Sequence, residues 1–579
     1  MENSIELNLK SLNEYIEGKC GGKEFFLGCW SNKNFKKTLI GDYDNIHCEQ
    51  GKNWLVLRNG ADQVKGLLFP KKQSSDPEIT VFKGYLAEQG IHTYSESQKV
   101  RKYWSGNHLS KHNGVFSAVT ITEEGAKLNL ITDLFGIAPL FIRKIKNYIF
   151  FTNVAGLLSL ENDTPNKMSW IMRLLLGYVP GKETLVEDVE KVSPASIVSY
   201  STEGKNKSQW YNYDEFPKGE EPYDDKVIDL SHKYFNVAMK RCLNIQYGTN
   251  LLALSSGYDS RRIFANLLDL GTNFKTCTVQ MPHYGGEDVD SVYGKKIAKD
   301  NRVDHTLIKM EDPEEWYHNK IQKNFCFDGL CDYHSWSVRF FKHYKNEKIS
   351  LYDGLLGDNF IFADWEYTEP TLGSIPKNTP WFFKDDFALT INEIEKNFRN
   401  LWAFEKIGKN RAIINFTLWQ ARNSTAYWAQ LQTNPGQVII YPYADIDYVE
   451  LMMRFRMKGE YSNLPQKDVL DKKWPELAKY PGTRDIPENS ANIKEKRSEM
   501  DKYAKNKILQ DCLSGNANKQ FKKILSLKGR IMMWLSQYIP AIRRKIDWWS
   551  EPLPEMIYWW VNRPQVISIR EFSENNKLP

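Results

Sequence analysis

Short apolar runs separated by turn residues dominate the first 155 positions of the chain. The first run is Phe25–Trp30, and the runs NWLVL, ITVFKGYL, GVFSAVTIT, LNLITDLFG and NYIFFT follow it. Regular spacing of short runs predicts an antiparallel β-sandwich rather than repeated strand–helix–strand units. Residues 1–24 hold no comparable run, and we expect a short polar helix there, as an extension that precedes the sandwich.

From about residue 225 the pattern changes to an alternation of helical and strand-like segments. Asp225–Cys242 has helical spacing, and the apolar strand NLLAL then leads into a polar turn and the helical segment SRRIFANLLDL, which Gly271 ends. The strand FKTCTVQ, the helix DVDSVYGKKIAKD, the strand DHTLIKM and the strand Ile349–Tyr352 follow. This order predicts a largely parallel sheet. Beyond about residue 375 the pattern is mostly helical.

Composition and charge narrow the possible classes of protein. The 579 residues are 41% apolar and 26% charged, which excludes a disordered chain. The net charge of +6 is too dilute to indicate a nucleic-acid partner. Eight cysteines without a CxxC pair favour neither a disulfide framework nor a structural zinc site. Because no apolar leader and no run of 18 apolar residues occur, we expect a cytoplasmic protein.

The turn Ser255–Ser260 is the clearest candidate for a binding site, because it lies between a predicted strand and a predicted helix. In parallel sheets, helix N-termini at the carboxyl ends of strands present N–H groups to anions. The small residues allow the backbone to approach a phosphate, and Asp259 is suited to hold the magnesium that phosphate chemistry requires. The alternative is an ordinary helix start in which Ser or Asp caps the N-terminus.

Four blocks of the sequence, in the same order, and one linker segment resemble the asparagine synthetase-like ATP pyrophosphatase family. LSSGYDSR resembles its SGGxDS pyrophosphate loop, and GGEDVDSVYGKKIAKDNRVDHTLIKM resembles the segment that follows. ISLYDGLLGDNFIFA resembles the second motif, a strand followed by GxGxDExxGG. The stretch from NGVFSAVTIT to NVAGLLSL resembles the end of the family's glutaminase domain, with a near copy of RDxxGxxPLY, and TLVEDVEKVSPASIVSY resembles its linker.

The resemblance implies a fold of two main domains. An Ntn-type antiparallel sandwich, αββα-like, and its linker would occupy residues 25–205, after the 1–24 extension. A parallel-sheet domain of the adenine nucleotide α-hydrolase (PP-loop) type would occupy 220–488, and a basic, aromatic helical region would occupy 489–579.

The resemblance also implies an activity, in which ATP and Mg²⁺ are used to adenylate a substrate carboxylate. Pyrophosphate is released, and ammonia or an amine attacks the mixed anhydride to give an amide. Asp259 and Asp358 match the family's two magnesium-binding aspartates. The implied nucleotide contacts are Leu254, Ser255, Ser256, Gly257, Tyr258, Asp259, Ser260, Val279 and Gly354.

Departures from the family pattern limit which of the family's residue roles we expect in this chain. Ser256 replaces a glycine, which is acceptable only if that position does not need a positive φ. Leu355 and Asn359 replace glutamates, so asparagine itself is a doubtful product, and a catalytically inactive nucleotide-binding relative is the alternative function. Arg261 replaces a common serine and is expected to neutralise pyrophosphate, or else to be a surface arginine at a helix start.

The family also places a basic catalytic side chain near the end of the second domain. The candidates in this chain, each of which is otherwise a solvated charge, are Lys467, Lys472, Lys473 and Arg484.

The glutaminase nucleophile of the family is missing at its usual place. Residue 2 is Glu rather than Cys, Thr132 replaces the arginine of RDxxGxxPLY, and the glutamine-holding runs RHRGPD and NGEIYN do not occur. We therefore expect a sandwich without glutaminase activity, and a free ammonia or amine donor. The alternative is processing that exposes Cys20 as a new N-terminus. The carboxylate, whether from a small molecule, a sugar or a peptide, stays open.

The C-terminal region combines basic and aromatic residues. KGRIMMWLSQYIPAIRRKIDWW mixes cations with tryptophans, and EMIYWWVNRP follows. Such a stretch is suited to an anionic membrane surface, and the same composition is suited to a nucleic-acid backbone. The alternative is a helical cap whose aromatic side chains pack on the preceding domain.

Overall fold

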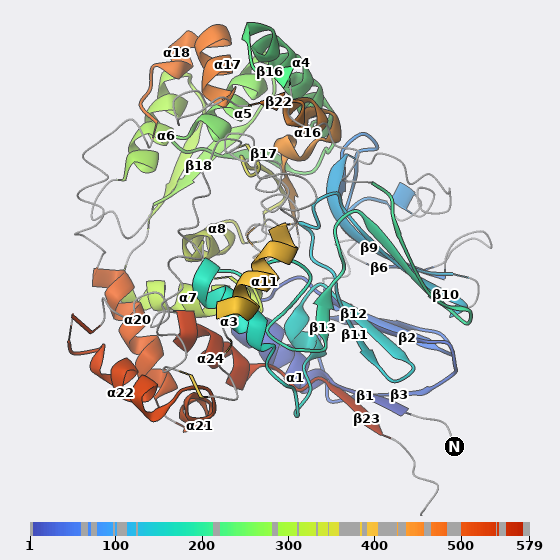
Figure 1. The fold of residues 1–579 in the computed structure, drawn as a ribbon. Coiled ribbons are helices and arrows are strands. Elements are labelled where there is room, and N and C mark those ends of the chain that lie inside the picture. Colours follow the sequence, from blue (N-terminus) through green and yellow to red (C-terminus); the bar gives the residue numbers. More distant parts are fainter. Residues whose placement is uncertain are drawn as a thin grey trace, which may run out of the picture.

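The fold comes from a computed structural model. It describes residues 4–59, 68–70, 78–96, 99–100, 113–122, 125–211, 221–280, 288–309, 312–331, 334–345, 347–357, 383–384, 389, 391–402, 425, 436–456, 465–482, 499–513, 515–539, 541–542 and 552–570. Within these ranges the chain combines antiparallel sheets, a parallel sheet and helices (Figure 1). The expected mixture of a β and an α/β part is therefore confirmed.

Two antiparallel sheets form the predicted sandwich in the first part of the chain. One has the order β15-β14-β10-β9-β7-β6, with β8 beside β7, and the other has the order β13-β11-β12-β2-β5-β4. The first consists of β6 (Leu68–Pro70), β7 (Ile79–Leu86), β8 (Ile91–His92), β9 (Gly114–Thr122), β10 (Lys127–Thr132), β14 (Ser196–Ser201) and β15 (Gly204–Gln209). The second consists of β2 (Phe26–Ser31), β4 (Ile46–Gln50), β5 (Trp54–Asn59), β11 (Phe141–Ile145), β12 (Tyr148–Thr152) and β13 (Val189–Lys191).

Strand β2 shows why its sequence is apolar at nearly every position. Phe26 and Trp30 point into the core between the two sheets, whereas Leu27 and Cys29 belong to the larger core on the other face. A strand that is covered on both faces does not alternate between apolar and polar residues. Strands β13 and β14 come from the segment that resembled a linker, β15 follows that segment, and the three strands extend both sheets up to Gln209.

The N-terminus differs from the helix expected over residues 1–24. It begins with the strand β1 (Ser4–Asn8), followed by the short helices α1 (Leu9–Asn13) and η1 (Glu14–Lys19). Strand β1 pairs in parallel with β3 (Lys36–Ile40) and antiparallel with β23 (Ile567–Arg570). The helices α1 and η1 confirm the helical part of the expectation, whereas β1 was not predicted. A strand of five residues that is completed by a partner more than 500 positions away leaves no local periodic signal.

The second part of the chain contains a five-stranded parallel sheet, as predicted. Its strands are β17 (Thr249–Ala253), β18 (Lys275–Val279), β19 (His305–Ile308), β20 (Ile349–Tyr352) and β21 (Gln437–Ile440). Their order across the sheet is β19-β18-β17-β20-β21. The chain therefore runs from β17 toward one edge, and then crosses back to β20 on the other side of β17. This reversal is a topological switch point.

Helices surround the parallel sheet in the upper part of Figure 1. They are α4 (Asp225–Cys242), α5 (Tyr258–Asp269), α6 (Val289–Asp300), η9 (Pro442–Ala444), α16 (Ile446–Met453), α17 (Pro465–Lys473) and α18 (Pro475–Ala478), with the small pair β16 (Glu221–Pro222) and β22 (Phe455–Arg456). On α5, Ile263, Phe264 and Leu267 are fully buried, which accounts for its helical apolar spacing.

A second group of helices lies in the lower part of the molecule (Figure 1). It contains η3 (Ala155–Leu158), α3 (Lys167–Leu176), α7 (Pro313–Cys326), η6 (Ser335–Ser337), α20 (Glu499–Cys512), α21 (Gly515–Ile524), α22 (Leu527–Leu535) and α24 (Pro552–Asn562). Helices α8 (Val338–His343) and α11 (Ile391–Trp402) lie between the two groups. Among the described helices, none is long and apolar enough to cross a membrane.

Candidate functional site

Two loops flank the switch point of the parallel sheet. One is the turn between β17 and α5, and the other is the segment Asp353–Gly357 that follows β20. Strands β17 and β20 are hydrogen-bonded neighbours with the register Leu252 to Tyr352, so their carboxyl ends lie side by side. Ligands of open parallel sheets bind at this place. The turn predicted to carry the chemistry is therefore at the expected position in the fold.

Helix α5 has an N-terminus that differs from those of its neighbours. Its N-cap is Gly257, which provides no side-chain hydrogen bond. The N-termini of α4, α6 and α16 are instead capped by the carboxylates of Asp224, Asp288 and Asp445. The positive end of the α5 dipole is thus not neutralised by its own cap residue, which is the arrangement that favours a bound anion. The alternative of an ordinary helix start capped by a Ser or Asp side chain is not found.

Side-chain hydrogen bonds fix the shape of this turn. The Ser255 amide donates to Ser260 Oγ at 3.1 Å, and the two serine hydroxyls lie 2.9 Å apart. Ser256 donates from its amide and its hydroxyl to Asp290 Oδ1, at 2.8 and 2.6 Å. Ser256 does not belong to the residues with positive φ, so serine meets no backbone strain at the position of the family's glycine. Sequence reasoning missed Asp290, although it lies in a block that matched the family.

Asp259, in the first turn of α5, is packed against the second loop. A Cβ atom on Gly357 would lie 2.5 Å from Asp259 Oδ1, and one on Gly354 would lie 3.1 Å from Asp259 Cβ. Both glycines are therefore required for this close approach, as their place in a GxxG pattern suggests. The Tyr443 hydroxyl donates to the Asp259 carbonyl oxygen at 3.0 Å. Asp358 and Asn359 follow Gly357 directly but lie outside the described residues.

Arg261 does not have the environment expected of a pyrophosphate ligand. Its side chain is fully buried, and the guanidinium donates to the carbonyl oxygens of Leu477 and Tyr480 at 3.1 and 2.7 Å, to Pro481 at 3.1 Å, and to Ser256. The guanidinium also lies over the Tyr258 ring, 5.0 Å from its centroid. Since these carbonyl groups occupy its donors, Arg261 ties the segment after α18 to the turn instead of facing outward at a helix start.

Arg262 connects the same helix to the second loop. Its guanidinium donates to Gln466 Oε1 at 2.5 Å, and the Gln466 amide donates in turn to the Gly357 carbonyl. Arg262 is fully buried and also donates to the Ser231 carbonyl on α4 at 2.7 Å. Neither Arg262 nor Gln466 was singled out from the sequence, because a buried arginine and a helical glutamine carry no motif.

The basic candidates near the end of the domain fall into two groups. Lys467, Lys472 and Lys473 are partly exposed on α17 and form ion pairs, the first with Asp471 at 2.6 Å and the other two with Asp229. Arg484 lies outside the described residues, three positions after Pro481, whose carbonyl Arg261 holds. Of these candidates, only Arg484 follows a segment that is hydrogen-bonded to Arg261 of the turn.

The remaining predicted contacts lie beneath the turn. Leu254 and Val279 are buried at the carboxyl ends of β17 and β18, where the Leu254 amide donates to the Cys277 carbonyl at 2.9 Å. His305 donates to or accepts from Thr276 Oγ1 at 3.0 Å, and burial lowers its pKa to about 4. Within the described ranges, no group of three or more His, Cys, Asp or Glu side chains is arranged to hold a metal ion.

Comparisons with known proteins show a relationship that covers part of the chain. The chain matches no protein-family model. Over 227 residues it is 25% identical to asparagine synthetase (glutamine-hydrolyzing) 1 of Bacillus subtilis strain 168. The match spans 38% of this chain and 34% of that protein, about a third of the relative's length. It supports a relationship to amidotransferase-type enzymes, without assigning this chain to one of them.

Two solved structures overlap with the chain only weakly. One is glutamine phosphoribosylpyrophosphate amidotransferase from B. subtilis complexed with ADP and GMP, at 10% identity and a TM-score of 0.22, covering 60% of this chain and 71% of that one. The other is described as the allosteric regulatory enzyme of purine biosynthesis, at 10% identity and a TM-score of 0.21, covering 60% and 73%. The overlap is too slight to place this chain in their fold.

Cys20 is kept away from solvent where it packs against helix α7. The Cys20 side chain is fully buried beside Cys326, whose thiol donates to the Cys20 carbonyl at 3.3 Å. Burial raises the pKa of the Cys20 thiol well above its ordinary value. A buried, protonated thiol is a poor nucleophile. In the chain as described, Cys20 therefore has a packing role.

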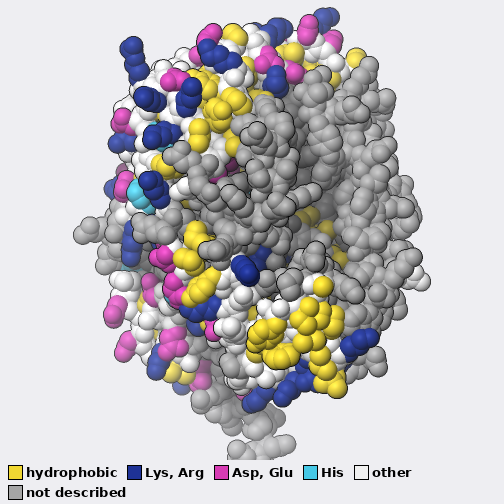
Figure 2. All heavy atoms as spheres, turned by 90° about the vertical axis from the view of Figure 1, so that its left-hand side faces the viewer, with side chains coloured by type: hydrophobic (Ala, Val, Ile, Leu, Met, Phe, Trp, Pro, Cys, Tyr) yellow, Lys and Arg dark blue, Asp and Glu magenta, His cyan; other side chains and the backbone are white. Residues whose placement is uncertain are grey.

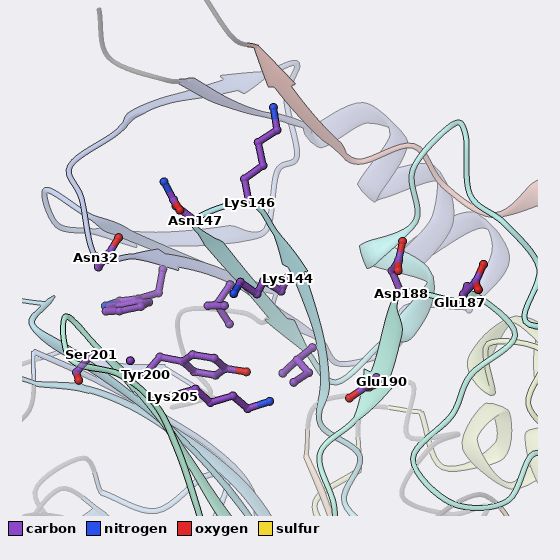
Figure 3. Close-up of a pocket in the computed structure, with 14 residues that line it drawn as sticks. Asn32, Lys144, Lys146, Asn147, Glu187, Asp188, Glu190, Tyr200, Ser201 and Lys205 are labelled. Atoms are coloured by element: carbon purple, nitrogen blue, oxygen red, sulfur yellow. The ribbon is translucent and has the colours of Figure 1, made fainter.

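A cavity of about 500 Å³ opens at one end of the sandwich (Figure 3). Trp30 and Tyr200 line it from the two sheets, Lys144 and Lys205 reach toward it, and Glu190 lies on its border. None of the catalytic or binding residues predicted from the sequence lines this cavity.

Proposed function

We propose that the protein is an ATP-dependent, AMP-forming amide ligase whose nucleotide site is the switch point of the parallel sheet. One observation carries the proposal: Asp259 lies between an anion-favouring helix N-terminus and a glycine loop that leaves no room for a Cβ atom. The resemblance of both loops to the ATP pyrophosphatase motifs and the partial match to asparagine synthetase support it.

The turn residues would bind the phosphates of ATP. The Ser255 and Ser260 hydroxyls would turn from each other toward the phosphates, with Gly257 leaving the approach open. The amides in the first turn of α5 have no acceptor within the helix, and the helix dipole favours negative charge there. Leu254, Val279 and Gly354 would form the floor under the nucleotide. In this proposal Arg261 is a positioning residue, because its contacts with four carbonyl groups fix the turn without reaching the ligand.

Asp259 and Asp358 would hold Mg²⁺. Magnesium is commonly bound by one or two carboxylates together with substrate phosphates, so two aspartates on adjacent loops suit it. The Asp259 carboxylate faces the residue that precedes Asp358 in the chain, which supports their cooperation. When bound, Mg²⁺ supplies charge neutralisation for the departing pyrophosphate.

The reaction would proceed in two balanced steps. An oxygen of the substrate carboxylate attacks the α-phosphorus of ATP, and the bond to the β-phosphate oxygen breaks to release pyrophosphate. The nitrogen of ammonia or an amine then attacks the carbonyl carbon, AMP leaves with the former carboxylate oxygen, and the nitrogen loses a proton. Arg484 is the basic residue that we assign to the first step, since it follows the Pro481 segment, whereas Lys467 is committed to Asp471.

We assign no glutaminase activity to the sandwich. The buried Cys20 and the Thr132 in place of the family's arginine support this assignment. The amine donor is then free ammonia or an amino group of a substrate, and the carboxylate belongs to a small molecule, a sugar or a peptide in the cytoplasm.

Pyrophosphate release from ATP, measured with Mg²⁺ and a panel of carboxylates and amines, tests the proposal. We expect one pair to stimulate release, and Asp259→Asn and Asp358→Asn each to reduce it at least about 100-fold. Asp304→Asn is the control, because Asp304 is exposed at the opposite end of the sheet, before β19. ATP binding without turnover in the whole panel would instead support an inactive nucleotide-binding relative, which the departures Leu355 and Asn359 favour.

A further inference from the structure

Helix α22 presents an apolar face to solvent. Leu527, Ile531, Trp534 and Tyr538 are 64, 49, 49 and 67% exposed. Their spacing of three or four residues places them on one side of the helix and the turn that follows it. The opposite side holds the buried Gly529 and Met533, so the helix is attached to the molecule by one face and leaves the other uncovered.

Basic residues border this face. The cations of α21, α22 and the turn between them include Lys519, Lys522, Lys523 and Lys528, all of which are exposed. No acidic residue occurs in the sequence between Asp511 and Asp547. Figure 2 shows the result, a hydrophobic patch in the lower part of the molecule with Lys and Arg side chains around it.

We propose that this face, defined as Leu527, Ile531, Trp534 and Tyr538 with the four lysines named above, docks on an anionic phospholipid surface. A lipid bilayer offers an apolar interior beneath a layer of negative headgroups, and the face offers exposed apolar side chains inside a ring of positive charge. Tryptophan and tyrosine suit the boundary because their rings carry both apolar area and a polar group. The Trp534 and Tyr538 rings lie together, with centroids 5.2 Å apart.

A protein partner is less suited to the same face. Lysine is rare in the core of protein interfaces, and protein surfaces carry charges of both signs. An anionic lipid surface is uniformly negative, so it complements the lysines around this face, among which no acidic residue occurs in the sequence. The face also lies in the lower helical group, away from the parallel sheet, so its occupation leaves the switch point open to solutes (Figure 1). The proposal therefore does not depend on the nucleotide site.

Flotation of the full chain with unilamellar vesicles tests the proposal. We expect binding to vesicles of phosphatidylcholine and phosphatidylserine (7:3) at 50 mM NaCl, and at least about tenfold weaker binding to phosphatidylcholine alone or at 500 mM NaCl. The variant Lys522→Glu/Lys523→Glu/Lys528→Glu should lose at least about tenfold in binding. Its control is Lys226→Glu/Lys233→Glu/Lys240→Glu on α4, at the other end of the molecule, which should bind as the unchanged chain does.

The apolar part of the face is tested separately by Ile531→Ser/Trp534→Ser. Both side chains are half exposed, so we expect an unchanged thermal midpoint together with at least about fivefold weaker vesicle binding. Leu230→Ser/Val237→Ser on α4 is the matched control, because its side chains are 37 and 40% exposed but the lysines of this helix are accompanied by the acidic Asp225 and Asp229. Absence of binding to anionic vesicles, or equal binding to both vesicle types, would overturn the proposal. A dimer in sedimentation velocity that Ile531→Ser/Trp534→Ser abolishes would assign the face to a second copy, and would overturn it as well.

Discussion

Arg261 shows how a single residue near the site acquires a structural role. The sequence places it one turn into α5, next to a turn that suits phosphate, and on that basis it was predicted to contact pyrophosphate. The structure directs its guanidinium to carbonyl oxygens of Leu477, Tyr480 and Pro481, which come from a segment more than 200 positions later. Such long-range acceptors are backbone groups, so no side-chain pattern in the sequence could reveal them.

Replacement of Arg261 should therefore destabilise the parallel-sheet part of the chain. We expect Arg261→Ala to lower its free energy of unfolding by about 3 kcal/mol, because several buried carbonyl groups lose a charged donor at once. Arg261→Lys should recover less than half of this, since one ammonium cannot reach carbonyls on both segments. Urea denaturation measures the effect, and the exposed Lys299→Ala is the control. Equal stability of Arg261→Ala and Lys299→Ala would contradict the assigned role.

His92 gives the sandwich a dependence on pH. Its Nδ1 accepts the amide of Tyr94 at 3.2 Å, so the ring is neutral, and burial, reinforced by Lys99, lowers its pKa to about 4. The unfolded chain protonates this residue near pH 6.5, so the stabilising contribution is complete above pH 6.5 and is lost as the pH falls toward 4.

The prediction for His92 compares urea unfolding at pH 7.5 and pH 5.0. Between these values the unchanged chain should lose about 1–2 kcal/mol more unfolding free energy than His92→Gln does. Replacement of the exposed His343 by Gln is the matched control for the loss of one histidine. If His92→Gln shows the same loss, His92 is not the group responsible.

At the scale of elements, the strands and helices around the switch point could be predicted with good bounds. Helix α4 was expected over Asp225–Cys242 and spans those residues, and the strand before Asp353 was expected over Ile349–Tyr352 and also spans them. Clear 3.6-residue periodicity and short β-branched runs explain this agreement. Two features could not be predicted from the sequence: the pairing of β17 with β20, and the absence of a side-chain cap at the N-terminus of α5. Strand order and cap geometry depend on contacts between residues that are distant in the chain.

The glycine loop after β20 is the element that brings Asp259 into place. Gly357→Ala adds a Cβ atom 2.5 Å from Asp259 Oδ1, and we expect the displaced carboxylate to reduce pyrophosphate release at least about tenfold. Gly18→Ala is the matched control, because nothing lies within 4 Å of its Cβ position. Full activity of Gly357→Ala, with an unchanged thermal midpoint in both variants, would contradict a precise role for this contact.

At the scale of the whole molecule, the two ends of the chain meet in one sheet. Strand β23 pairs with β1, and Val566 and Ile567 are buried. The sequence predicted a polar helix at one end and a helical region at the other, because each short strand takes its partner from the opposite end of the chain. Contacts of this separation leave no local pattern.

Truncation tests the contribution of this closure. Removal of 567–579 should lower the thermal midpoint by several degrees, because β1 loses its antiparallel partner and apolar residues of α24 and β1 become exposed. Removal of 571–579 alone is the control and should leave the midpoint unchanged. A midpoint that is the same in both truncations would mean that β23 contributes little.

The most direct test of the nucleotide site is a structure of the protein determined with Mg²⁺ and a non-hydrolysable ATP analogue. We predict the phosphate chain of the analogue at the N-terminus of α5, between Ser255–Ser260 and the loop that contains Gly354 and Gly357, with Mg²⁺ bound by Asp259 and Asp358. An analogue bound instead in the cavity beside Tyr200, or anywhere remote from Asp259, would contradict the account.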